Sequence, residues 1–303
     1  MLKDTMLYLA RQESIRRFVS TNGAARRMSR RFVAGETLDD AIAATRPLNQ
    51  QHISVSLDHL GENVADAAEA RATAQGYITI LDRISAEGVE ANISIKLTAL
   101  GLDISEDLCR ENLLLLMRRA RDLNIFVRLD MEGSAYTQRT MDFVLELRKD
   151  FDQVGTVLQS MLHRTPKDVE ALIATNTRVR LVKGAYLEPS AIAYPRKADV
   201  DAKYVECMHA LLERGAYPAI ATHDEHIIAE TKRFAAAHDI SKARFEFQML
   251  YGIRRDLQEK LAREGYNVRV YIPYGTQWYP YLTRRMAERP ANLIFIASNA
   301  FRG

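Results

Sequence analysis

The stretch ANISIKLTALGLDISEDLCRENLLLLMRRARDLNIFVRLDME, residues 91–132, decides the fold class. It begins and ends with short segments rich in β-branched residues, ANISIKLT (91–98) and NIFVRLDME (124–132), and residues 106–123 between them follow a helical pattern. A strand, a helix and a second strand at this spacing predict a right-handed parallel βαβ unit.

The same unit recurs along the chain from residue 52 onward. Gly88, Gly215 and Gly265 follow three of the helical stretches, where glycine commonly ends a helix. Eight such units in about 240 residues predict a closed (β/α)8 barrel. The other strands are expected at 52–58, 153–159, 178–184, 217–223, 243–249 and 267–273, and the helices at 62–88, 106–123, 136–150, 166–176, 198–214, 224–238, 252–264 and 276–289.

An open doubly wound sheet is the alternative to the barrel. Such sheets usually carry a dinucleotide site in a G-x-G-x-x-G turn. The chain contains no G-x-G spacing, no P-loop and no G-x-S-x-G nucleophile elbow. The sequence therefore favours an α/β barrel.

The composition is typical of a globular protein with a basic N-terminal end. Apolar residues make up 47% and charged residues 27% of the 303 residues, and no apolar run reaches the ~18 residues of a membrane span. Residues 1–31 contain eight Lys or Arg and two Asp or Glu, whereas the remainder is slightly acidic. We expect a helical N-terminal arm over residues 1–50, solvated or in contact with anionic lipid, and a barrel domain over residues 51–303.

Cysteine usage and the N-terminal charges favour a cytoplasmic location. Cys109 and Cys207 lie far apart, form no CxxC motif and are expected to be reduced thiols. Charged residues interrupt any apolar region near the N-terminus, which argues against a secretory signal.

Polar and apolar residues alternate along the strand segments, which is unusual for a parallel barrel. Ile93 and Ile95, for example, alternate with Asn92, Ser94 and Lys96. The apolar set must face the helices, so the polar set must point into the barrel. Because interior charges are costly unless paired or bound, we expect an ion-pair network with a large polar ligand, or a network that only stabilises the barrel. The members expected to meet at the C-terminal mouth are Lys96, Asp130, Gln159, Arg180, Gln248 and Tyr271.

The segment YIPYGTQWYPYLTRRMAERP (271–290) has the composition of a carboxylate clamp. Tyr281, Arg284 and Arg285 share one side of the expected last helix, and arginine binds carboxylates through two parallel hydrogen bonds. Five aromatic residues between 271 and 281 would wall a compact, partly apolar ligand. A solvated basic turn is the alternative for the arginine pair.

Two further motifs are ambiguous. In VRLVKGAY (179–186), Lys183 could form a Schiff base, but it shares the parity of the helix-facing residues, which favours a lysine at the rim. In THDEH (222–226), two histidines flank Asp224 and Glu225 without the third ligand of a zinc motif. Capping of the next helix is the favoured interpretation, and no metal is expected.

Six runs together resemble the flavin-dependent proline dehydrogenase (proline oxidase) family in its short monofunctional bacterial form. They are RLDMEGSAY (128–136), RLVKGAY (180–186), YPRKADVDAKY (194–204), ATHDEH (221–226), FEFQMLYG (245–252) and YIPYGTQWYPYLTRRMAE (271–288). The resemblance implies a distorted (β/α)8 TIM barrel with FAD at its mouth. It also implies oxidation of L-proline to Δ1-pyrroline-5-carboxylate by hydride transfer from C5 to flavin N5, with electrons passed to a membrane quinone, as the first step of proline catabolism to glutamate.

The resemblance also implies a role for each matching position. Arg284, Arg285 and Lys96 would bind the proline carboxylate, Asp130 would brace Lys96 or an arginine, and Glu62 would close the site as a gate by pairing with Arg285. The catalytic group would be Lys96, Asp130, Arg180, Tyr271, Arg284 and Arg285. Tyr186, Leu250, Tyr271 and Tyr281 would wall the substrate ring. The cofactor-binding residues would be Asp130, Gln159, Arg180, Lys183, Gly184, Ala185, Lys197, Thr222, His223, Gln248 and Glu288.

The partners implied by the resemblance are L-proline and a quinone, with transient contact at the inner face of the membrane. A separate pyrroline-5-carboxylate dehydrogenase could act on the product, and no nucleic-acid partner is expected. Two alternatives stay open from the residues alone. One is a barrel lyase or aldolase that uses Lys96 or Lys183 as a Schiff base, and the other is a non-catalytic anion-binding barrel.

Overall fold

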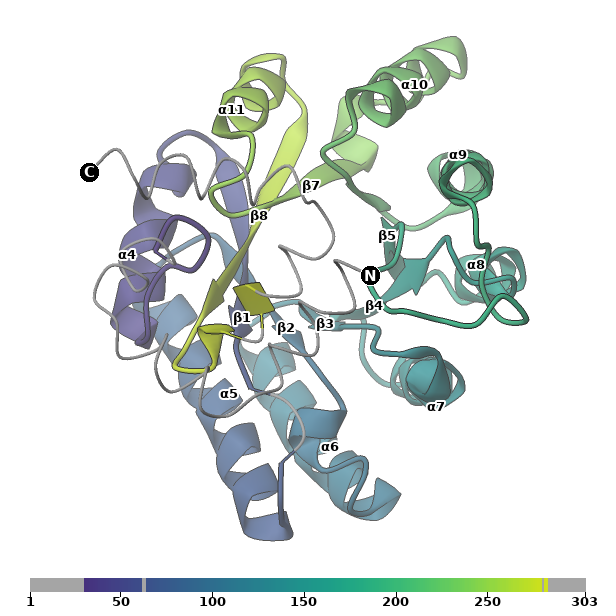
Figure 1. Cartoon of the computed structure of the whole chain (residues 1–303). Coiled ribbons are helices and arrows are strands. Elements are labelled where there is room, and N and C mark those ends of the chain that lie inside the picture. Colours follow the sequence, from purple (N-terminus) through teal and green to yellow (C-terminus); the bar gives the residue numbers. More distant parts are fainter. Residues whose placement is uncertain (1–29, 62–63, 280, 283–303) are drawn as a thin grey trace, which may run out of the picture.

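The computed structural model describes residues 30–61, 64–279, 281 and 282, and it contains a closed barrel of eight parallel strands (Figure 1). The strands follow one another around the barrel in chain order, and β8 pairs with β1 to close it. The predicted fold class is therefore confirmed. The strands are β1 (Ile53–His59), β2 (Ala91–Ile95), β3 (Val127–Leu129), β4 (Val154–Gln159), β5 (Arg178–Val182), β6 (Ala219–Ala221), β7 (Glu246–Leu250) and β8 (Asn267–Tyr274).

Helices surround the strands, one after each of the first seven (Figure 1). Gly88 ends α5 in the left-handed conformation with φ of 60°, where a side chain would be strained. The expected helix at 276–289 lies largely outside the described residues. The helices are α4 (Leu38–Asn49), α5 (Ala67–Glu87), α6 (Glu106–Asp122), α7 (Ser134–Leu147), α8 (Thr165–Ala174), α9 (Lys197–Arg214), α10 (Glu225–Ala237) and α11 (Arg255–Arg263), with short 3-10 turns η1 (Thr98–Leu100) and η2 (Lys242–Arg244).

The alternation of the strands sorts their residues between two environments, as predicted. Ile93 and Ile95 are fully buried in the apolar core between strands and helices. Ser94, between them, accepts a hydrogen bond from Arg180 of β5 at 3.0 Å. A side chain of β5 reaches β2 only across the barrel interior, so the polar set points inward.

Three strands begin two or three residues later than the sequence suggests. The strand expected from residue 243 begins at Glu246, because Lys242–Arg244 form the η2 turn. Asn124 and Tyr217 were expected to start strands 3 and 6, but their φ values are 53° and 46°. These angles lie outside the β region of backbone conformation. Consequently β3 begins at Val127 and β6 begins at Ala219.

The chain before β1 packs against the closing strand of the barrel. Thr37 and Asp40 form a capping box at the start of α4, and Ala41 and Ile42 of α4 enter the main core. We call residues 31–35 the N-terminal strap. Its Ala34 N–H donates to Pro273 O at 3.0 Å, and Gly35 O accepts from Gly275 N–H at 2.9 Å. The strap is thereby bound to the C-terminal end of β8.

None of the helices that the structure describes is long and apolar enough to cross a membrane.

Candidate active site

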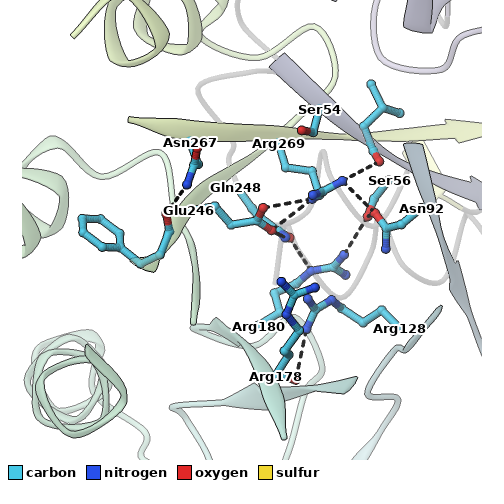
Figure 2. Close-up of polar contacts among 12 residues, drawn as sticks. Ser54, Ser56, Asn92, Arg128, Arg178, Arg180, Glu246, Gln248, Asn267 and Arg269 are labelled. Atoms are coloured by element: carbon cyan, nitrogen blue, oxygen red, sulfur yellow. Dashed lines mark hydrogen bonds and ion pairs between the residues drawn. The ribbon is translucent and has the colours of Figure 1, made fainter. Parts of the chain in front are cut away.

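Arg180, in the middle of β5, is the centre of the polar barrel interior (Figure 2). Its Nε donates to Gln248 Oε1 at 2.5 Å and its Nη1 donates to Asp130 Oδ1 at 2.7 Å. Its Nη2 donates to Ser94 Oγ at 3.0 Å and to Ser56 Oγ at 3.4 Å. Four strands or strand ends thus fix one buried guanidinium, and Asp130, Arg180 and Gln248 of the expected set meet here.

Asp130 holds both Arg180 and Tyr271. Its second oxygen accepts from the Tyr271 hydroxyl at 2.8 Å, and the Tyr271 ring lies 5.0 Å from the Arg180 guanidinium carbon. Burial and the charge of Asp130 raise the pKa of Tyr271 well above its ordinary value, so this phenol stays protonated. Asp130 was expected to pair with Lys96 or with an arginine, and the structure shows its pair with Arg180.

Lys96 pairs with a residue that the sequence reading did not single out. Its Nζ lies 3.1 Å from Asp58 Oδ1, and the Asp58 side chain is almost fully buried at the end of β1. Asp58 shares the parity of Ser54 and Ser56, which could have identified it as an inward-facing carboxylate. The pair places an ammonium group close to the Arg180–Asp130 centre.

A second polar layer lies deeper in the barrel (Figure 2). Arg269 Nε contacts both carboxylate oxygens of Glu246, at 3.0 and 3.1 Å, and its Nη1 donates to Asn92 Oδ1. Burial opposes ionisation of Glu246, but the charge of Arg269 outweighs it and holds the pKa of Glu246 below its usual range. Gln248 donates to Glu246 and accepts from Arg180, so it joins the two layers.

Arg128 is a cation of this deeper layer for which the structure shows no ion-pair partner among the described residues. It is 3% exposed, and its Nη1 donates to the carbonyl oxygens of Thr156 and Arg178. Burial, followed by repulsion from Arg180 and Arg269, lowers its pKa well below the ordinary value. The sequence reading placed Arg128 on an alternating strand but gave it no role.

Residues at the ends of β4 to β6 form a separate part of the mouth. Lys183 lies 2.6 Å from Asp201 and 2.9 Å from Asp224, and Lys197 also pairs with Asp201. A lysine in contact with two carboxylates lacks the desolvated setting of a Schiff-base lysine. Gln159 donates to Glu132 O at 2.9 Å, and the Thr222 hydroxyl accepts from Asp224 N–H.

The THDEH turn is a helix cap, as predicted. Asp224 is the N-cap of α10 and accepts from His226 N–H at 3.1 Å, while His223 Nε2 accepts from Leu250 N–H at 3.0 Å. Within the described ranges, no three His, Cys, Asp or Glu residues lie close enough to hold a metal ion.

The remaining predicted residues are spread around the mouth or lie outside the description. Tyr186 packs against the small apolar cluster of Met161, Leu162 and Ala193, beyond the β5 end that also carries Gly184 and Ala185. Tyr281 packs in a different cluster beside β8. Glu62, Arg284, Arg285 and Glu288 lie outside the described residues.

The donor set at the mouth fits a flavin nucleotide. Hydrogen bonds to described residues use four of the five N–H groups of Arg180, which leaves one Nη1 hydrogen for a ligand. A guanidinium, the amide of Gln159 and the ammonium groups of Lys183 and Lys197 are the groups that bind carbonyl and phosphate oxygens. Gln159 ends β4, Lys183 directly follows β5 and Lys197 begins α9, so these three groups lie at the end of the barrel where barrel enzymes bind their ligands.

A closed (β/α)8 barrel with buried, hydrogen-bonded charges at its C-terminal mouth defines a barrel enzyme. The family model described as "Proline dehydrogenase" matches residues 41–298. The chain belongs to the proline dehydrogenase family and is an oxidoreductase of proline catabolism, which confirms the resemblance found in the sequence.

Curated relatives match over nearly the whole chain. A proline dehydrogenase of Deinococcus radiodurans is 43% identical over 281 residues, which cover 91% of this chain and 91% of the relative. Proline dehydrogenase 2 of Bacillus subtilis (strain 168) is 41% identical over 301 residues and covers 99% of this chain and 98% of the relative.

A solved structure has the same fold. Proline utilization A from Bdellovibrio bacteriovorus superimposes with a TM-score of 0.82 at 25% identity. The match covers 93% of this chain and 38% of that longer chain. The similarity therefore concerns one part of the longer protein.

Proposed function

We propose that this chain binds FAD and L-proline at the barrel mouth and oxidises proline to Δ1-pyrroline-5-carboxylate. The observation that carries the proposal is the Arg180 guanidinium, which four acceptors hold in place and which keeps one N–H group for a ligand. Membership of the proline dehydrogenase family supports the choice of substrate.

FAD would supply the acceptor for the hydride that leaves C5 of proline, as flavins do in such oxidations. Arg180, already oriented by its neighbours, would stabilise negative charge that develops beside it without reorganising. Asp130 would keep Arg180 and Tyr271 in one arrangement. The other residues proposed to hold the cofactor are Gln159, Lys183, Gly184, Ala185, Lys197, Thr222, His223, Gln248 and Glu288.

The substrate carboxylate would be bound by Lys96 together with Arg284 and Arg285. Asp58 would keep the Lys96 ammonium directed into the mouth, where it contacts Asp58 at 3.1 Å. With the carboxylate fixed, the proline amine would enter neutral, and its lone pair would form the C=N bond as the hydride leaves C5. Tyr186, Leu250, Tyr271 and Tyr281 would exclude water from the ring, and Glu62 would close the site by pairing with Arg285.

The electrons would pass to a membrane quinone. The protein would then be cytoplasmic with transient contact at the membrane surface, and its product would suit a separate pyrroline-5-carboxylate dehydrogenase. We place the catalytic barrel at residues 51–303 and the N-terminal arm at residues 1–50.

The test is the absorption spectrum of the purified protein. We expect a flavin absorption band at about 450 nm that bleaches when proline is added without oxygen and returns on addition of a quinone. Arg180→Met should weaken both flavin retention and bleaching, whereas the exposed Arg244→Met should change neither. A flavin-loaded protein whose band is unchanged by proline would refute the proposed substrate.

A further inference from the structure

The N-terminal strap (residues 31–35) packs against the segment that follows β8. Val33 is 2% exposed and shares an apolar cluster with Trp278, Tyr279, Tyr281 and Leu282, which also contains Leu60. The two backbone hydrogen bonds to Pro273 and Gly275 fix the strap directly before this segment. One side of the segment is therefore covered by residues that precede the barrel in the sequence.

The strap also touches the loop after β7. Gly252 has φ of 73°, and a Cβ atom placed on it would lie 1.7 Å from the carbonyl oxygen of Arg31. No other residue type fits there without moving the strap, since this obstacle is backbone rather than a flexible side chain. The strap thus lies against the chain following both β7 and β8.

These contacts are on the substrate side of the proposed site. Leu250 ends β7, and Tyr271 lies near the end of β8. Tyr281 is in the apolar cluster with Val33. Arg284 and Arg285 follow Tyr281 by three and four positions in the sequence. The groups proposed for the cofactor come mainly from the ends of β4, β5 and β6 and from α9. Val33 and its cluster include none of those groups.

We infer that the N-terminal strap positions the substrate-binding segment, with Val33 acting through Tyr281. This role rests on the proposed function, because it assigns Tyr281 to the substrate wall. Loss of the strap contacts should let the segment after β8 shift, which weakens proline binding while flavin binding persists. Val33 is a positioning residue, since it shares its apolar cluster with this segment and with Leu60 and with none of the groups proposed to bind the cofactor.

The experiment compares two pairs of matched variants. Val33→Ser and Val169→Ser make the same change at sites that are 2% and 1% exposed, but Val169 lies on α8, away from the segment. Gly252→Ala and Gly265→Ala both place a side chain at positive φ, 73° and 80°, but a Cβ at Gly265 meets nothing within 4 Å. Each control therefore reproduces the local damage without disturbing the strap.

Two readouts separate positioning from general destabilisation. The first is KM for proline, which should rise about fivefold or more in Val33→Ser and Gly252→Ala, with flavin content unchanged, since small misplacements of binding groups have effects of this size or larger. The second is the fluorescence of Trp278, which is the single tryptophan of the chain and is 3% exposed. Its emission should shift to the red in both strap variants and in neither control.

The results distinguish the possible failures. A red shift with unchanged KM, or equal rises in KM in variants and controls, would refute the positioning role. Val33→Ile keeps the apolar contact, so it should retain a KM near that of the wild type even if Val33→Ser folds poorly. A raised KM in Val33→Ile with normal Trp278 fluorescence would also count against the positioning role. A flavin-loaded wild-type protein that does not respond to proline would refute the proposed function instead.

Discussion

Asp130 divides its two oxygens between a permanent cation and a phenol. Oδ1 accepts from Arg180 and Oδ2 accepts from Tyr271, so the carboxylate orients two side chains from opposite parts of the barrel. Removing the Asp130 carboxylate should therefore lower the free energy of unfolding by more than the value of one hydrogen bond, because the donors of Arg180 and Tyr271 would both lose a partner in a buried site.

Tyr271→Phe tests this coupling while keeping the aromatic ring. Removing the hydroxyl leaves Asp130 Oδ2 without its donor, and we expect a loss of about 1–3 kcal/mol in the free energy of unfolding. Tyr271→Phe should lower the free energy of unfolding by less when Asp130 is already replaced by Asn, with a coupling free energy above about 0.5 kcal/mol between the two substitutions. Urea unfolding of the wild type, the two single variants and the double variant measures this coupling. Strictly additive effects would contradict the shared role of Asp130.

The arginine pair gives the second prediction at this scale. Arg284→Met or Arg285→Met should lower kcat/KM for proline. The corresponding loss of transition-state stabilisation should be about 2–5 kcal/mol, the usual loss when one partner of a buried charge pair is removed. Flavin content should stay near wild type because the proposed contact is with the substrate. Steady-state kinetics beside the exposed Arg244→Met control would show the difference, and full activity of either variant would reject that arginine as part of the clamp.

Individual residues were the least predictable part of the site. Arg180, Gln248 and Tyr271 were found because they have the inward parity within their strands, and Asp130 continues that parity just after β3. Asp58 had the same parity but was not identified, because parity alone does not show which side chain Lys96 reaches. Alternation gives the face of a residue, whereas partners depend on how far each side chain reaches across the barrel.

At the scale of elements, β7 and β8 are joined by a buried ion pair as well as by backbone hydrogen bonds. Glu246 begins β7 and contacts Arg269 of β8, and both lie in the deeper polar layer. The exposed pair of Glu170 and Arg214 joins α8 to α9 at the surface. The two pairs allow the same substitution to be compared in opposite environments.

Glu246→Gln should lower the free energy of unfolding by about 3–5 kcal/mol, because it leaves the Arg269 charge buried without its counter-ion. Glu170→Gln should have a much smaller effect, since water screens that pair. Urea titrations at pH 7 measure both. Equal effects would mean that the deeper layer is more hydrated than its burial indicates.

The elements themselves were predictable because strand alternation and helical periodicity extend over many residues. All eight strands occur where the sequence placed them, whereas the starts of β3, β6 and β7 moved by two or three positions. The starts of β3 and β6 depend on Asn124 and Tyr217, which adopt positive φ, and the start of β7 depends on the η2 turn before it. Such local backbone choices are set by how each helix ends, which a periodic pattern does not encode.

At the scale of the molecule, the paired carboxylates determine how the protein responds to acid. Burial opposes ionisation of Glu246, Asp201 and Asp224, but their cationic partners hold each pKa below its ordinary value. Their stabilising contribution is therefore complete at a pH above the pKa values of the unfolded state, about 4–4.5, and is lost as the pH falls through the lower pKa values of the folded state.

Stability should accordingly fall steeply once the pH drops below about 4.5. The urea midpoint followed from pH 6 to pH 3 measures this loss. Glu246→Gln has lost one of the contributing groups, so its midpoint should depend less on pH than that of the wild type. Parallel curves for the two proteins would show that Glu246 does not titrate as the ion pair requires.

Charge is also unevenly distributed along the whole chain. Residues 1–29 contain six Lys or Arg and two Asp or Glu. A protein that lacks them should bind anionic vesicles more weakly than the full chain, most clearly at low salt, because screening is then weakest. Co-sedimentation with anionic and with neutral vesicles tests this, and equal binding of both proteins to anionic vesicles would exclude a membrane role for these residues.

The seam of the barrel has a consequence for synthesis on the ribosome. β1 pairs with β8 along seven residues, from Ile53 opposite Val268 to His59 opposite Tyr274, so more than two hundred residues separate the partners. A growing chain must therefore keep one edge of its first strand open until its last strand has been translated. Nascent chains that stall before residue 267 would expose this edge to other chains, which makes the closing strand the step at which chaperone protection matters most.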